Sequence, residues 1–156
     1  MKKIILTVIL AFALFSAKAQ LPYKALSQFN GDTVAYLEYN FVTHKNEFIG
    51  NTVEMVIEWL EIPIYQVNSF GPYVQADNKW YMHGIDINYE PRSETLKKWR
   101  DRGKPVLVFR IHFEPPYEDD WAFWYYAPPF TSERERALYV KDKIVKDIEV
   151  RIMITE

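Results

Sequence analysis

The nine residues VLVFRIHFE, at positions 106–114, constrain the fold of this chain more than any other stretch. They are rich in β-branched and aromatic residues, which fit the pleated surface of a sheet. Alternate side chains of a strand point to opposite faces, and here one set is apolar: Leu107, Phe109, Ile111 and Phe113. The other set is polar or charged: Arg110, His112 and Glu114. This pattern predicts a strand at residues 105–114 with one apolar and one polar face.

Two segments have the spacing of amphipathic helices. In VEMVIEWLEI, residues 53–62, one apolar face is formed by Val53, Val56, Trp59 and Leu60. Pro63 follows and is expected to end this helix. The second helix, ETLKKWRDR at residues 94–102, is expected to begin after a cap at Ser93 and to end before Gly103.

The remaining segments predict shorter elements. Asp32 can cap a helix in TVAYLEYNF, residues 33–41, for which a strand is the alternative. Another short helix is predicted to start at Thr131 or Ser132. Further strands are predicted at residues 64–67, 73–76, 79–90 and 148–155, with a hairpin turn at Asp77-Asn78.

The first twenty residues, MKKIILTVILAFALFSAKAQ, have the features of a signal peptide. Two lysines precede an uncharged run from Ile4 to Phe15, and small residues precede Gln20. The run has 12 residues, whereas a membrane-spanning helix needs roughly 18 or more. We therefore expect residues 1–19 to be a cleaved signal peptide without a membrane span, and the protein to be exported to the periplasm or the extracellular space.

Charge and cysteine content narrow the classes of partner. Removing residues 1–19 changes the formal charge from -2 to -5, which argues against nucleic acid as a partner. The chain has no cysteine, which excludes disulfides, thiol nucleophiles and zinc–thiolate sites. Small exported domains of higher organisms usually carry disulfides, so the composition favours a bacterial protein.

Helices and hairpins alternate without a regular βαβ rhythm, which predicts an α+β fold. We expect residues 20–156 to form a single domain, with helices packed on a largely antiparallel sheet of about five or six strands. The core is predicted to include Trp59, Leu60, Phe109, Ile111 and Phe113. His83 is expected to lie with Ile85 and Ile87 on the apolar side of its strand.

The segment WAFWYYAPPF, residues 121–130, contains six aromatic rings. Proline pairs precede and follow it, so residues 121–127 are predicted to form a strand rather than part of a long helix. We expect this strand to pair with residues 105–114 in a hairpin, where Glu114 faces Trp121, His112 faces Phe123 and Arg110 faces Tyr125. A slip of one residue would exchange this set of rings for Trp124 and Tyr126.

This hairpin supplies the candidate ligand-binding residues: Trp121, Phe123, Tyr125, Arg110, His112 and Glu114. Exposed aromatic patches mark interaction sites, although rings clustered on strands more often belong to a core. His112 and Glu114 are too few to form a zinc site, and the acidic run 118–120 lacks the spacing of a calcium loop. No catalytic motif, metal site or cofactor site is recognised.

The sequence therefore predicts an exported binding or interaction module of the bacterial cell envelope rather than an enzyme. Its expected partner is an envelope protein or a glycan. The alternative is a small glycan-directed hydrolase that uses paired carboxylates, a geometry that sequence spacing does not reveal.

Overall fold

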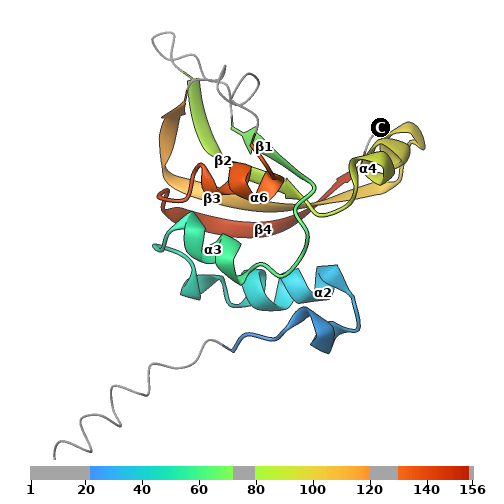
Figure 1. Cartoon of the computed structure of the whole chain (residues 1–156), viewed down its shortest axis with the longest axis horizontal. Helices are drawn as coiled ribbons and strands as arrows, with labels where there is room; N and C mark the ends of the chain where they lie inside the picture. Colours follow the sequence, from blue (N-terminus) through green and yellow to red (C-terminus); the bar gives the residue numbers. More distant parts are fainter. Residues whose placement is uncertain (1–21, 72–79, 120–129, 155–156) are drawn as a thin grey trace, which may run out of the picture.

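The computed structural model describes residues 22–71, 80–119 and 130–154. Its strands form one antiparallel sheet in the order β1-β2-β3-β4 (Figure 1). The strands are β1 Gln66–Phe70, β2 Trp80–Asn88, β3 Pro105–Asp119 and β4 Val145–Ile154. The predicted α+β arrangement is confirmed, with four strands in the described residues instead of the expected five or six. The predicted strands at 73–76 and 121–127 lie outside the described residues.

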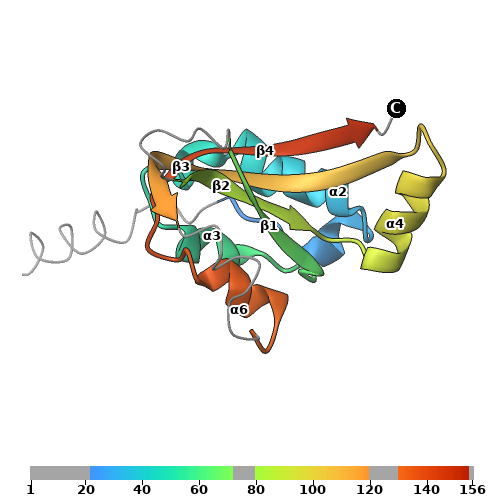
Figure 2. The ribbon, with the colours of Figure 1, turned by 90° about the horizontal axis from the view of Figure 1, so that it is seen from above.

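The helical elements divide into two groups. One group packs on one face of the sheet: η1 Leu26–Phe29, α2 Thr33–Leu37, η2 Glu38–Thr43, η3 Lys45–Glu47, α3 Val53–Trp59 and α6 Glu133–Leu138. Helix α4, Arg92–Arg100, lies apart from these at one end of the sheet (Figure 2). The expected helix at residues 33–41 is confirmed as α2 continued by η2, a stretch of π-helix.

Side-chain caps explain where two helices begin. Asp32 Oδ1 accepts a hydrogen bond of 2.9 Å from the Ala35 N–H at the start of α2. Ser132 Oγ accepts one of 3.1 Å from the Glu135 N–H at the start of α6. The cap predicted at Ser93 is wrong, because α4 begins at Arg92 and its N-cap position is Pro91. Proline pre-sets the backbone for a helix start without a side-chain acceptor.

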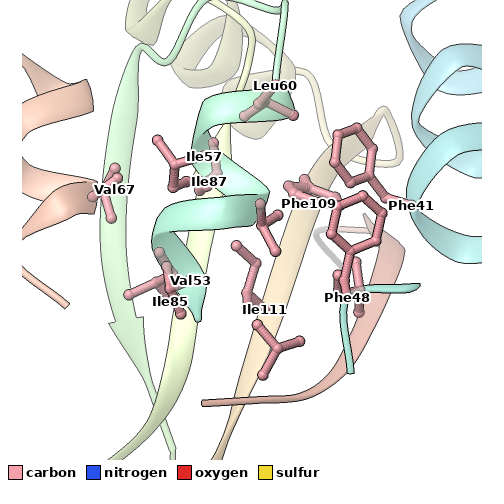
Figure 3. Close-up of a cluster of buried hydrophobic side chains, with 14 of the residues drawn as sticks. Phe41, Phe48, Val53, Ile57, Leu60, Val67, Ile85, Ile87, Phe109 and Ile111 are labelled. Carbon is pink, nitrogen blue, oxygen red and sulfur yellow. The ribbon is translucent and has the colours of Figure 1, made fainter. Parts of the chain in front are cut away.

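The hydrophobic core lies between α2, η2, α3 and α6 and one face of the sheet (Figure 3). The predicted core positions Leu60, Phe109, Ile111 and Phe113 are at most 2% exposed. Trp59 was also expected to be deeply buried, and this is wrong. It is the last residue of α3 and lies at the flank of the buried stripe, where its ring packs edge-on against Tyr23 at 5.0 Å.

Strand β3 is longer than predicted and has different neighbours. It pairs with β4 from Pro105 to Phe113, and with β2 at residues 109–112 and 117–119. Both edges of residues 109–112 are thus occupied, so the predicted pairing of 105–114 with 121–127 is wrong. The Pro115-Pro116 pair falls in the interruption of both ladders, where a missing backbone N–H costs no ladder hydrogen bond.

A register shift between β2 and β3 interrupts the side-chain alternation near the start of β2. The register with β3 shifts between Met82 and Gly84. Met82 consequently joins the core with 3% exposure, while His83 is partly exposed. The expectation that His83 packs beside Ile85 and Ile87 is therefore wrong.

Candidate functional site

The sheet face opposite α2, α3 and α6, called the outer face below, carries the polar side chains of the strands. Cross-strand pairing places eight of its members in two rows: Phe70, Gly84, His112 and Asp147, then Asn68, Asp86, Arg110 and Glu149. Beyond these rows, Gln66 pairs with Asn88, Val108 with Arg151, and Val106 with Met153. The predicted alternation along β3 is confirmed at Arg110 and His112, which lie on this face, away from Phe109 and Ile111 in the core.

Arg110 is the centre of a charged cluster on the outer face. Its Nε and Nη2 donate to the two carboxylate oxygens of Asp86, at 2.6 and 2.7 Å. Its guanidinium also lies 3.9 Å from the ring centroid of Phe70. The hydrogen bonds to Asp86 raise the pKa of Arg110 above its ordinary value. The cation is therefore already paired on its own sheet, in a bidentate geometry that fixes its position.

Phe70 can occupy this position because a glycine lies opposite. A Cβ added at Gly84 would lie 2.3 Å from Phe70 Cε1 and 2.1 Å from the Ile111 carbonyl oxygen. The Phe70 ring also meets the His112 ring edge-on at 4.9 Å. His112 Nε2 in turn lies 2.9 Å from Glu149 Oε1. Phe70 thus connects the arginine and the histidine across three strands.

The other predicted binding residues are not part of this cluster. Glu114 lies beyond the bulge at which the β3–β4 register shifts, and it is exposed. Trp121, Phe123 and Tyr125 lie outside the described residues. Arg110 and His112 have Asp86, Gly84, Glu149 and Asp147 as cross-strand neighbours, in place of the expected Tyr125 and Phe123.

A groove opens where α4 meets the outer face. Four α4 residues form its wall at helical spacing: Arg92, Thr95, Leu96 and Trp99. The sheet forms its floor with Gln66, Asn68, Asp86, Asn88, Val106, Val108 and Met153. The groove has a volume of about 380 Å³. Leu96 and Trp99 are 51% and 50% exposed, which is unusual for large apolar side chains on one helix face.

One ion pair holds α4 beside the sheet, and one hydrogen bond stabilises the first turn of the helix. Lys98 Nζ lies 2.5 Å from Glu90 Oε1, just after the end of β2. Thr95, which is 9% exposed, donates its hydroxyl to the Pro91 carbonyl at 3.3 Å. The wall of the groove is thus tied to β2, the strand that also supplies part of its floor.

The floor of the groove contains an amide group with an unused acceptor. Asn88 is 7% exposed, and its Oδ1 has no hydrogen-bond partner among the described residues. The neighbouring amides differ, because Gln66 Nε2 donates to Asn68 Oδ1 at 2.9 Å. Buried polar atoms are nearly always bonded, so the Asn88 side chain has an acceptor that the described residues leave unused.

A second cavity of about 240 Å³ adjoins the groove along the edge of β1. The two cavities share Gln66, Asn68 and Arg92. The second is bounded on its far side by Glu133, whose Oε2 accepts a hydrogen bond of 2.8 Å from the Val67 N–H. This contact closes part of the exposed edge of β1.

Other kinds of site are not found in the described part of the chain. Across residues 22–71, 80–119 and 130–154, no three side chains of the His, Cys, Asp and Glu types lie close enough to hold a metal ion. Every helix in the same ranges is too short or too polar to cross a membrane.

Comparison of the chain with protein-family models, with curated proteins and with solved structures finds no match. The features that define the molecule are its small α+β domain and the groove on the outer face of its sheet.

The groove was not predicted from the sequence. The signal was present in the spacing of Leu96 and Trp99, which share a helix face with Arg92 and Thr95. Helical periodicity shows that these residues share one face of the helix. It does not show whether that face packs into a core or lines a groove.

Proposed function

We propose that this protein is an exported binding module of the bacterial cell envelope or secreted space, and that its ligand occupies the groove between α4 and the outer face. The observation that carries the proposal is the groove itself. Binding sites are concave, mostly apolar and equipped with a few polar groups, which describes the wall of Leu96 and Trp99 above the amides of β1 and β2.

The state of the carboxylates on the outer face favours binding over hydrolysis. A glycosidase needs one carboxylate as an acid and another as a nucleophile or base. Both oxygens of Asp86 accept hydrogen bonds from Arg110, and Glu149 Oε1 lies 2.9 Å from His112 Nε2. Both carboxylates are thus engaged by side chains of the sheet itself, which favours a structural role for them over a role in hydrolysis.

The aromatic segment is a proposed extension of this surface. We propose that Trp121, Phe123 and Tyr125 also contribute rings to ligand binding, as the sequence pattern predicts. Support for this part of the proposal comes from the sequence pattern alone.

Binding to envelope components tests the proposal. The purified chain is immobilised and exposed to envelope protein extracts and to a glycan array, in parallel with the variants Trp99→Ala and Ile152→Ala. We expect Trp99→Ala to weaken retention at least tenfold. Ile152→Ala should have no effect, because Ile152 is 64% exposed and is not part of the groove. Equal retention by both variants would refute the groove as the binding site.

A further inference from the structure

We infer that the groove binds a saccharide, with one hexopyranose ring packed against Trp99. This inference rests on the proposed function and names the ligand class of the same site. It follows from the distribution of apolar and polar atoms on the groove walls, from an unsatisfied amide oxygen in its floor, and from the local charge balance.

The groove walls match the two-sided character of a pyranose ring. One part of the lining is apolar: Leu96, Trp99, Val106, Val108 and Met153. The other part carries amides, a carboxylate and a hydroxyl: Gln66, Asn68, Asn88, Asp86 and Thr95. A pyranose presents C–H groups on its face, which pack on an aromatic ring, and hydroxyl groups around its rim. A fatty chain would leave the amides unsatisfied, which costs free energy.

Asn88 supplies the most specific part of the argument. Its side chain is more than nine-tenths buried at the groove, and Oδ1 accepts no hydrogen bond from the described residues. Asn88 lines the groove, and a sugar hydroxyl is a hydrogen-bond donor that its amide oxygen can accept from. Binding would satisfy a group that folding leaves unpaired.

Charge favours a ligand whose polar atoms are mainly hydroxyls. The negative charge of Asp86 is balanced by the bidentate contact with Arg110, so the floor of the groove attracts neither cations nor anions strongly. Arg92 stands at the rim, where its guanidinium can donate to ring or hydroxyl oxygens. The volume of about 380 Å³ is at the lower end of the range for ligand sites, which suits one or two sugar rings.

The test uses oligosaccharides of defined composition as probes. The purified chain is titrated calorimetrically with neutral hexose, N-acetylhexosamine and uronate oligosaccharides. We expect one of these classes to bind, Trp99→Ala to weaken that binding at least tenfold, and Trp99→Phe to retain part of it. Leu96→Arg, at a position 51% exposed, should also block the groove without disturbing the core. Ile152→Ala is the matched control, and thermal unfolding of every variant shows whether it folds.

Three outcomes would overturn the inference. Saccharide binding that is unchanged in both Trp99→Ala and Leu96→Arg would place the sugar elsewhere. If no saccharide binds but an envelope protein is captured in a Trp99-dependent way, the saccharide is refuted as the ligand. The proposed binding function would then be supported. Failure to bind any saccharide or any envelope component would refute the inference and the proposed function together.

Discussion

Two buried tyrosines differ in how their hydroxyl groups are bonded. The Tyr36 hydroxyl donates to the Trp59 carbonyl at 3.0 Å, accepts from the Glu61 N–H at 2.9 Å, and lies 2.8 Å from the Tyr23 hydroxyl. The Tyr89 hydroxyl is buried and has no hydrogen-bond partner among the described residues. Burial raises the pKa of Tyr36 and of Tyr89 above the ordinary value, so both stay neutral in the folded protein.

This difference predicts opposite effects of the same substitution. Tyr36→Phe should lower the free energy of unfolding by about 1–3 kcal/mol, because it leaves the Glu61 N–H without its acceptor. Tyr89→Phe should leave stability unchanged or raise it by up to about 1 kcal/mol, since it removes an unsatisfied hydroxyl. Urea unfolding of both variants measures the difference. Equal losses in the two variants would show that the Tyr89 hydroxyl is bonded after all.

An ion pair at the edge of β4 predicts a dependence of stability on pH. Burial alone would raise the pKa of Asp147, but hydrogen bonds from Lys45 and from the Ile148 N–H, with the Lys45 charge, lower it below the ordinary value. The Lys45 Nζ to Asp147 Oδ1 distance is 2.7 Å. A carboxylate with a lowered folded-state pKa stabilises the protein above its unfolded-state pKa, and this stabilisation is lost as pH falls through the folded-state value.

Lys45→Met should therefore reduce stability near neutral pH and have a shrinking effect below about pH 4. The effect should be under about 1 kcal/mol, because both side chains are about two-fifths exposed and solvent screens the pair. Urea midpoints between pH 2 and pH 7 provide the measurement. A difference between variant and parent that persists undiminished at pH 2 would contradict this assignment.

At the scale of the element, the packing of β1 on β2 and β3 depends on Gly84. An alanine there would collide with the Phe70 ring and with the Ile111 carbonyl oxygen. We expect Gly84→Ala to destabilise the protein by about 1–3 kcal/mol through overpacking. Ile152→Val, on the exposed end of β4, is the control and should have almost no effect. Thermal unfolding of both variants would decide the matter, and a Gly84→Ala protein as stable as the parent would refute the role of this glycine.

Local patterns in the sequence predicted most of the elements. The cap at Asp32, the apolar stripe of α3 and the alternation along β3 each depend on residues within one or two turns or pleats. The pairing of strands was less predictable. Strand β4 pairs with β3 although the paired residues are 32 to 49 positions apart in the sequence. The register shift between Met82 and Gly84 cannot be seen in the hydrophobic pattern.

The side chains that β3 contributes to the candidate site could be predicted from the sequence, but their partners on other strands could not. Alternation along β3 correctly placed Arg110 and His112 on the same face. Their partners required a knowledge of register, because Asp86 is 24 positions from Arg110 and Glu149 is 37 positions from His112. The groove depends on where α4 docks, which is set by contacts such as Lys98 with Glu90.

For the whole molecule, the two faces of the sheet have different roles. The inner face and its helices contain the cluster of fully buried aromatic and aliphatic side chains that stabilises the fold. The outer face carries an arginine–aspartate ion pair and an amide oxygen without a hydrogen-bond partner among the described residues. Two exposed apolar side chains of α4 lie beside it. This division lets side chains of the groove change without loss of the core.

The N-terminal segment, residues 1–19, predicts that the protein is exported. The basic start, the uncharged run from Ile4 to Phe15 and the small residues before Gln20 predict cleavage after Ala19. Tyr23 lies four positions after Ala19, and its hydroxyl donates to the Trp59 carbonyl at 3.0 Å. Cleavage after Ala19 would leave this contact intact.

Expression in a bacterial host with an intact secretion pathway tests this prediction. Intact-mass measurement of the periplasmic or secreted protein should give the mass of residues 20–156, with Gln20 at the N-terminus. Ala17→Arg with Ala19→Arg should block cleavage and leave the precursor bound to the membrane, because a signal peptidase requires small residues at these positions. A parent chain that keeps residues 1–19 in the membrane fraction would show that the segment is an anchor. The proposed binding surface would then be held at the membrane.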